Sequence, residues 1–302
     1  MLSFKFDAFL KKRFIHFRMT IISDLSRLLR ISQWYKNLLI FVPLIFSLNL
    51  FNLDIFLRVL LGFLSLSLLS SSYYIINDLK DIEKDKHHPE KKKRPLASGR
   101  TPKFLAALLF FFLFINSLAI AFFLSNIFFT IMIVLFALSQ IYNLILRNIA
   151  FFDIIAISLN FVVRILSGSF LIGVTPQYPL VLSAFFLSVF MVSGKRISET
   201  YLSDLIKYRP SLSKQHKDTL TLMATVSVAS TIILFSFYAL EISKPLLLLT
   251  LPLSFYLVLV YFNSVFHNPE KIRNPEKFIF DKRIILSLFF WTVLLILALY
   301  VF

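Results

Sequence analysis

Three aspartates at the end of a long apolar run are the residues of this sequence best suited to chemistry. Asp78, Asp81 and Asp85 follow the apolar stretch 59–76 and are spaced i, i+3 and i+7. If a helix continues through them, they share one face. Clustered carboxylates repel one another unless a cation holds them, and hard oxygen ligands suit Mg²⁺, which completes its shell with waters and substrate phosphates. The spacing therefore predicts a magnesium site that binds a phosphorylated substrate.

A basic segment follows the aspartates and contains Lys91, Lys92, Lys93 and Arg94. Lysine and arginine side chains are common ligands of phosphate groups. We expect these four residues to supply positive charge for any phosphate that the metal leaves uncovered. The simpler interpretation is a solvated charged loop between two helices. It accounts for the basic residues but not for aspartates in phase on one helix face.

A second polar set lies inside an apolar segment. Asn160 and Arg164 follow Asp153 by seven and eleven residues, and at 100° per residue each returns to within about 20° of the direction of Asp153. Charged side chains inside a membrane are costly and usually functional. We expect this stripe to line a cavity opposite the first aspartates. The alternative is a structural Asp–Arg pair between helices.

Lys195 and Arg196 end a further apolar segment and could contact phosphate or simply anchor a helix end. Glu199 could pair with either of them at i+4 or i+3.

The composition defines the class of protein. The chain has 302 residues, 58% hydrophobic, with 37 phenylalanines, whereas soluble domains are about 45–50% apolar. We predict an all-α integral membrane protein. Nine apolar segments approach the length that spans about 30 Å of hydrocarbon. They are placed at 36–53, 56–77, 104–124, 127–146, 150–173, 178–195, 220–240, 244–263 and 284–302. Residues 1–30 are predicted to be a basic amphipathic extension, and residues 31–302 a nine-helix catalytic domain.

The distribution of charge predicts the orientation in the membrane. Of 32 Lys and Arg residues, all but Arg58, Arg164 and Lys244 lie in the N-terminal segment or the even-numbered connections. Positive charge marks the cytoplasmic side, so the N-terminus and the polar clusters are predicted to face the cytoplasm from the cytoplasmic membrane. The net charge of +16 indicates contact with anionic membrane lipid rather than with nucleic acid. The sequence has no cysteine, no zinc-type histidine spacing, no Gly-rich phosphate loop and no nucleophile motif.

The motif Asn77-Asp78-x-x-Asp81-x-x-x-Asp85 after the second apolar segment resembles the UbiA superfamily of intramembrane prenyltransferases. The resemblance runs from about Arg30 to the C-terminus. Within the superfamily, the sequence is most similar to a subgroup that transfers phosphoribosyl groups. Further residues that carry it are Gln33-Trp34-Tyr35-Lys36-Asn37, Tyr142, Arg147, Asp153, Arg164, Lys195 and Arg196. Two departures stand out. Ile157 replaces the second aspartate of a usual Asp-x-x-x-Asp motif that begins at Asp153, and Arg147 stands where Lys is expected.

The resemblance implies a nine-helix bundle and a Mg²⁺-dependent transferase. Asp78, Asp81 and Asp85 would hold Mg²⁺ on the diphosphate of phosphoribosyl diphosphate, with Asp153 as a further catalytic residue. The acceptor would be a polyprenyl phosphate, which needs no general base because it is already anionic at neutral pH. The implied substrate-binding residues are Lys36, Asn77, Lys91, Arg94, Tyr142, Arg147, Arg164, Lys195 and Arg196. The product would serve synthesis of a cell-envelope polysaccharide precursor.

Two other functions fit parts of the sequence. A prenyltransferase of the same superfamily would move an isoprenyl group from its diphosphate to an aromatic or lipid acceptor, and the residue at Ile157 argues against it. A transporter could use the polar stripe as a pathway, but the sequence shows no inverted repeat.

Overall fold

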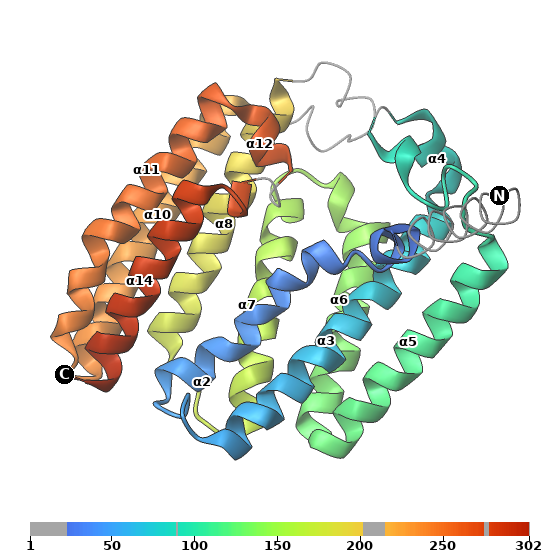
Figure 1. The fold of residues 1–302 in the computed structure, drawn as a ribbon. Helices are drawn as coiled ribbons and strands as arrows, with labels where there is room; N and C mark the ends of the chain where they lie inside the picture. The colour runs from blue at the N-terminus through green and yellow to red at the C-terminus, as the bar shows by residue number, and fades with distance from the viewer. Residues whose placement is uncertain (1–22, 89, 202–214, 275–277, 302) are drawn as a thin grey trace, which may run out of the picture. The chain divides into compact units, whose positions relative to one another are not determined.

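The structure, a computed structural model, describes residues 23–88, 90–201, 215–274 and 278–301. These residues are almost entirely helical and contain no strand (Figure 1). A helix satisfies its own backbone hydrogen bonds, which a lipid environment requires. The predicted all-α fold class is confirmed. Most of the basic extension predicted at 1–30 lies outside the described residues; its last part, 23–29, is helical.

Eight helices among the described residues are long and apolar enough to cross a membrane. They are Leu53–Lys80, Lys103–Leu124, Asn126–Asn148, Phe152–Ile172, Tyr178–Thr200, Lys217–Glu241, Pro245–His267 and Lys282–Tyr300. The chain is therefore an integral membrane protein. The predicted first span, 36–53, corresponds to a shorter apolar helical segment, Ile31–Phe46. Its helix ends early because the chain turns at Leu48, whose φ of 61° is left-handed. The nine-helix count and the orientation remain predictions.

The chain divides into two compact units. Unit 1 comprises residues 1–35 and 65–119 and contains most of α3 (Leu53–Lys80), α4 (Ile82–His87), η2 (Lys91–Lys93) and most of α5 (Lys103–Leu124). Ser65 of α3 and Ser117 of α5 each donate a 2.8 Å hydrogen bond to the other's carbonyl oxygen. Small hydroxyl residues allow such close helix packing in membranes. The apolar core of unit 1 consists of Leu28, Ile75, Ile82, Leu96, Ala106 and Leu113.

Unit 2 comprises residues 36–64 and 120–302. Its helices are η1 (Ile31–Phe41, which begins in unit 1), α2 (Val42–Phe46), α6 (Asn126–Leu144), η3 (Leu146–Asn148), α7 (Phe152–Ile172), α8 (Tyr178–Thr200), α10 (Lys217–Glu241), η5 (Pro245–Thr250), α11 (Leu251–His267), α12 (Pro269–Arg273) and α14 (Lys282–Tyr300). Helix α8 packs against α7 and α10, and α7 packs against α6 and α2 (Figure 1). The helices α6, α7 and α8 therefore form consecutive neighbours in this unit.

At Gly168 the backbone of α7 closely approaches η1 and α2 at the start of unit 2. A Cβ atom at this position would lie 2.2 Å from the carbonyl oxygen of Ile40 and 3.2 Å from Pro43. Because glycine has no side chain, η1 and α2 can rest directly on the α7 backbone. This contact fixes where the residues of η1 meet the polar face of α7.

Candidate functional site

The chain passes the aspartate motif in a nearly continuous helical course. Helix α3 ends at Lys80, Asp81 is a turn residue, and α4 begins at Ile82. The amide of Asp81 donates to the carbonyl of Asn77, and the amide of Asp85 donates to that of Asp81. The uninterrupted helix expected from the spacing is therefore broken at Asp81, but its helical hydrogen bonds continue on both sides. Asp78 and Asp85 consequently point to a common partner.

That partner is Arg94. Its Nη1 lies 2.9 Å from Oδ1 of Asp78 and 2.6 Å from Oδ2 of Asp85. Arg30 Nη2 lies 2.5 Å from the same Oδ1 of Asp78, and Lys91 Nζ lies 3.9 Å from Oδ1 of Asp85. Both carboxylates are buried. The cation expected between the aspartates is thus, in this structure, an arginine side chain.

Arg30 was not among the site residues that the motifs indicate. It follows the helical residues 23–29 with a left-handed φ of 51°, and its guanidinium lies 4.5 Å from the ring centroid of Tyr74. This stacking and the contact with Asp78 fix the side chain between α3 and the N-terminal segment. A lone arginine 48 residues before its partner gives no local signal, so spacing arguments could not identify it.

The side-chain oxygen atoms around the motif are of the chemical type that binds divalent cations. Two buried carboxylates and the half-buried Asp81 supply hard oxygens. The side-chain oxygen Oδ1 of Asn77 is buried and has no hydrogen-bond partner, so a cation would satisfy it. Among the residues that the structure describes, no group of three acidic or histidine side chains is assembled as a metal site. Asp78, Asp81, Asp85 and Asn77 are the residues that would hold Mg²⁺.

The basic segment is organised by His88. Its Nδ1 accepts hydrogen bonds from the amides of Glu90 and Lys91, at 3.2 and 3.3 Å, and so holds the start of η2. Burial, with the neighbouring charge of Lys91, lowers the pKa of His88, and a neutral imidazole can accept at Nδ1. Burial and then the charge of Arg94 lower the pKa of Lys91. Cations are therefore concentrated here in a partly dehydrated loop.

A second buried network lies in unit 2. Arg196 of α8 donates from Nε to Oδ2 of Asp153 at 2.8 Å and from Nη1 to Oε2 of Glu199 at 2.8 Å. Gln215 donates from Nε2 to Oδ1 of Asp153, also at 2.8 Å. Asp153 is fully shielded from solvent and Arg196 is 1% exposed. The predicted pairing of Glu199 with a base at i+3 is confirmed. Gln215 is a partner that sequence reasoning missed.

The polar residues of the predicted stripe along α7 contact different partners at different heights of the helix and do not form one cluster. Arg164, eleven residues and about 16 Å of helix rise from Asp153, donates from Nε to Oδ1 of Asn37 at 2.9 Å. Asn160 accepts a hydrogen bond from the hydroxyl of Ser139 on α6. The alternative, a structural Asp–Arg pair between helices, does occur at Asp153, and its arginine is Arg196 of α8.

The remaining predicted site residues of unit 2 are half-buried. Tyr142 lies near the end of α6, Arg147 in η3, Lys195 near the end of α8, and Lys36 in η1. The end of α6, the start of α7 and the end of α8 are joined by short connections and helix contacts. Tyr142, Arg147 and Lys195 thus belong to the same end of the unit as Asp153.

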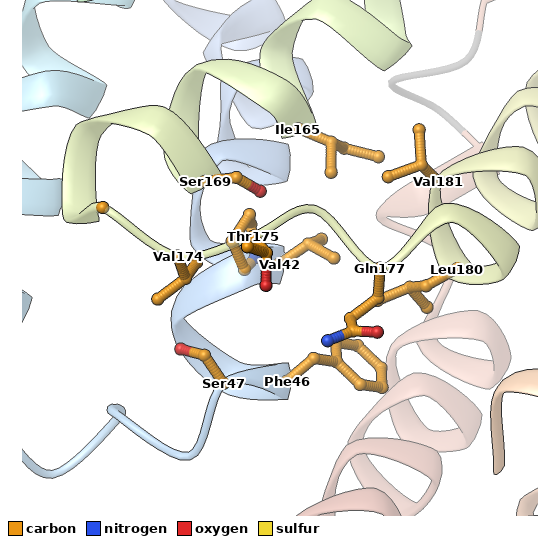
Figure 2. A pocket seen from close by; sticks show the side chains of 12 residues that line it. Val42, Phe46, Ser47, Ile165, Ser169, Val174, Thr175, Gln177, Leu180 and Val181 are labelled. Atoms are coloured by element: carbon orange, nitrogen blue, oxygen red, sulfur yellow. The ribbon is translucent and has the colours of Figure 1, made fainter. Parts of the chain in front are cut away.

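A pocket of about 400 Å³ occurs at the other end of α7. Figure 2 shows side chains of α2, α7 and the α7–α8 connection around it, among them Phe46, Ser47, Ser169 and Gln177. Ser169 is about 24 Å of helix rise from Asp153. None of the predicted site residues lines this pocket, so it is separate from the buried network.

The chain belongs to the UbiA prenyltransferase family, which matches residues 39–294. Its curated relatives include a decaprenyl-phosphate phosphoribosyltransferase of Mycobacterium tuberculosis (strain CDC 1551 / Oshkosh), 29% identical over 231 residues, which are 73% of this chain and 75% of the relative. The protein of the same name from Mycolicibacterium smegmatis is 31% identical over 229 residues, 72% of this chain and 71% of the relative.

Solved structures share the fold. A UbiA homolog from Archaeoglobus fulgidus bound to GPP and Mg²⁺ superimposes with a TM-score of 0.67 at 21% identity, covering 90% of this chain and 99% of that one. A structure described for digeranylgeranylglyceryl phosphate synthase gives a TM-score of 0.64 at 19% identity, covering 92% and 98%. The chain is therefore a membrane-embedded transferase of the UbiA fold.

Proposed function

We propose that this protein transfers a 5-phosphoribosyl group from phosphoribosyl diphosphate to the phosphate of a polyprenyl phosphate, at the cytoplasmic face of the cytoplasmic membrane. The names of the curated relatives support the transferred phosphoribosyl group and the class of acceptor. The observation that carries the proposal is the state of Asp153. Both of its carboxylate oxygens are occupied, by Arg196 and Gln215, and Ile157 offers no second carboxylate. Asp153 is therefore not available as a metal ligand, and the carboxylates around Asp78 would form one metal site that binds one diphosphate.

In the proposed reaction the bond from C1 of the ribose to the diphosphate breaks, and C1 forms a bond to a phosphate oxygen of the acceptor. Asp78, Asp81, Asp85 and Asn77 would hold Mg²⁺, which would supply positive charge for the leaving diphosphate. The acceptor phosphate is already anionic near neutral pH, because its second pKa is about 6, so no residue needs to remove a proton. The product enters the synthesis of a cell-envelope polysaccharide precursor.

The chain's cations have distinct proposed roles. Arg94 and Lys91 bind oxygens of the diphosphate or of the donor's 5-phosphate, because they already lie against the aspartates that hold the metal. Lys195, Lys36, Arg147 and Tyr142 are further substrate-binding residues. Arg196 is buried and held by two carboxylates, so it contacts substrate only if this network opens. Otherwise it positions Asp153. Arg164, held by Asn37, orients the start of unit 2.

Purified protein in detergent, incubated with radiolabelled phosphoribosyl diphosphate, polyprenyl phosphate and Mg²⁺, should yield label in the lipid extract. In competition, the protein should prefer phosphoribosyl diphosphate to geranyl diphosphate. Two charge-assisted contacts to the second phosphate, at about 1.5 kcal/mol each, correspond to at least a hundredfold. Label that stays in the aqueous phase in every condition would reject the proposal.

A prenyltransferase is the second candidate, because the family is named for prenyl transfer. It predicts that geranyl diphosphate binds at least as well as phosphoribosyl diphosphate and that label from it moves to an aromatic or lipid acceptor. The same competition experiment therefore separates the two functions.

A further inference from the structure

The aspartates of unit 1 are already neutralised by the chain itself. Oδ1 of Asp78 accepts from both Arg30 and Arg94, and Oδ2 of Asp85 accepts from Arg94. With Lys91 near Oδ1 of Asp85, the two buried carboxylates Asp78 and Asp85 face three cations of the chain, Arg30, Lys91 and Arg94. A divalent cation that entered this set alone would bring a net positive charge into a partly buried space, which is unfavourable.

We propose that Arg94, assisted by Arg30, is a resident counter-cation that occupies the metal position until a diphosphate arrives. A metal ion and an anionic diphosphate enter together, the guanidinium of Arg94 leaves the carboxylates, and it then pairs with the diphosphate oxygens. Arg94 is thus a positioning residue that couples metal binding to diphosphate binding. Such coupling is reciprocal: each ligand raises the affinity for the other by the same factor.

The backbone around Arg94 allows this exchange. The amide of Arg94 donates to the carbonyl of Lys91 at 2.9 Å, and the carbonyl of Arg94 accepts from the amide of Ser98 at 2.9 Å. Arg100 adds a 2.7 Å hydrogen bond to the carbonyl of Lys93 and an ion pair with Asp24 at 2.8 Å. The loop is therefore anchored without the Arg94 guanidinium, whose side chain is 28% exposed. The side chain can change partners while the loop stays in place.

The inference rests on the proposed function only in assuming a diphosphate donor, and its test requires neither ribose nor prenyl groups. Mn²⁺ is titrated into the full chain in detergent, with free Mn²⁺ measured by electron paramagnetic resonance, first alone and then with inorganic diphosphate. The variants are Arg94→Gln, Arg94→Lys and, as a matched control, Arg100→Gln, which removes an arginine of the same loop that pairs with Asp24. Circular dichroism checks that each variant is folded.

Without diphosphate, Arg94→Gln should bind Mn²⁺ at least tenfold more tightly than the unmodified chain, whereas Arg94→Lys and Arg100→Gln should stay within about twofold. Diphosphate should raise the Mn²⁺ affinity of the unmodified chain at least tenfold and that of Arg94→Gln much less. If Arg94→Gln binds Mn²⁺ alone no more tightly, the counter-cation role is wrong, whichever donor the enzyme uses. If the protein does not use phosphoribosyl diphosphate as its donor, the Mn²⁺ result is unchanged. The failure of the proposed function can therefore be distinguished from the failure of the counter-cation role.

Discussion

Arg196 reaches from α8 to α7 and donates a 2.8 Å hydrogen bond to Asp153, with both side chains almost completely shielded from solvent. Removing one partner of a buried ion pair leaves an uncompensated charge, which costs about 3–5 kcal/mol. We therefore predict that Arg196→Ala strongly lowers the thermal unfolding midpoint in detergent. In contrast, Lys271→Ala breaks an exposed pair with Asp281 and should shift the midpoint little.

If Arg196→Ala fails to fold, a compensated variant keeps the prediction testable. Arg196→Met combined with Asp153→Asn and Glu199→Gln removes the arginine together with both charges that it neutralises. This triple variant should fold and unfold at a higher temperature than Arg196→Ala alone. An equally low midpoint would show that the cost comes from lost packing rather than from unpaired charge.

The carboxylate at the turn between α3 and α4 is expected to be essential for turnover. Asp81→Asn keeps the size of the side chain but replaces an anionic ligand, so we predict loss of Mg²⁺-dependent transfer with little change in stability. The matched control is Glu83→Gln, two residues away, whose exposed carboxylate pairs with Lys86. Glu83→Gln should retain activity. Normal transfer by Asp81→Asn at low Mg²⁺ would remove Asp81 from the metal site.

Sequence reasoning succeeded where the relevant partners are close in the chain. Apolar segment length predicted the helices, and helical phase brought Asp78 and Asp85 to a common partner. It did not predict the contacts of Arg30, Gln215 and Asn37, whose partners lie 48, 62 and 127 residues away in the chain. Such contacts depend on which helices pack together, and no periodicity within one helix encodes that. The first span was predicted too long because apolar composition continues past the turn at Leu48.

Low pH should weaken the basic loop through His88. Burial lowers the pKa of His88 in the folded protein, whereas the unfolded chain has a pKa of about 6.5. The unfolded state therefore binds the proton more readily, and stability present above about pH 6.5 is lost as the pH falls towards the folded pKa. Protonation also removes the Nδ1 acceptor for the amides of Glu90 and Lys91.

Thermal midpoints of the unmodified chain and of His88→Asn, compared between pH 7.5 and 5.5, measure this effect. Asparagine keeps an acceptor oxygen near the position of Nδ1 but does not titrate, so His88→Asn should lose less stability on acidification. The adjacent variant His87→Asn should decline as the unmodified chain does. Equal declines in all three proteins would exclude His88 as the source.

The close approach at Gly168 predicts a strong effect of a single methyl group. In Gly168→Ala the new Cβ would lie 2.2 Å from the carbonyl oxygen of Ile40, a backbone atom that cannot move without displacing η1. Overpacking of this kind costs about 1–3 kcal/mol or more, so the unfolding midpoint should fall. Ser158→Ala in the same helix is the control: its buried Oγ has no hydrogen-bond partner, so its removal should be neutral or stabilising. Because η1 also carries Asn37, the partner of Arg164, Gly168→Ala should reduce activity even at temperatures at which the variant is still folded. A variant as stable and active as the unmodified chain would show that η1 does not rest on α7 as described.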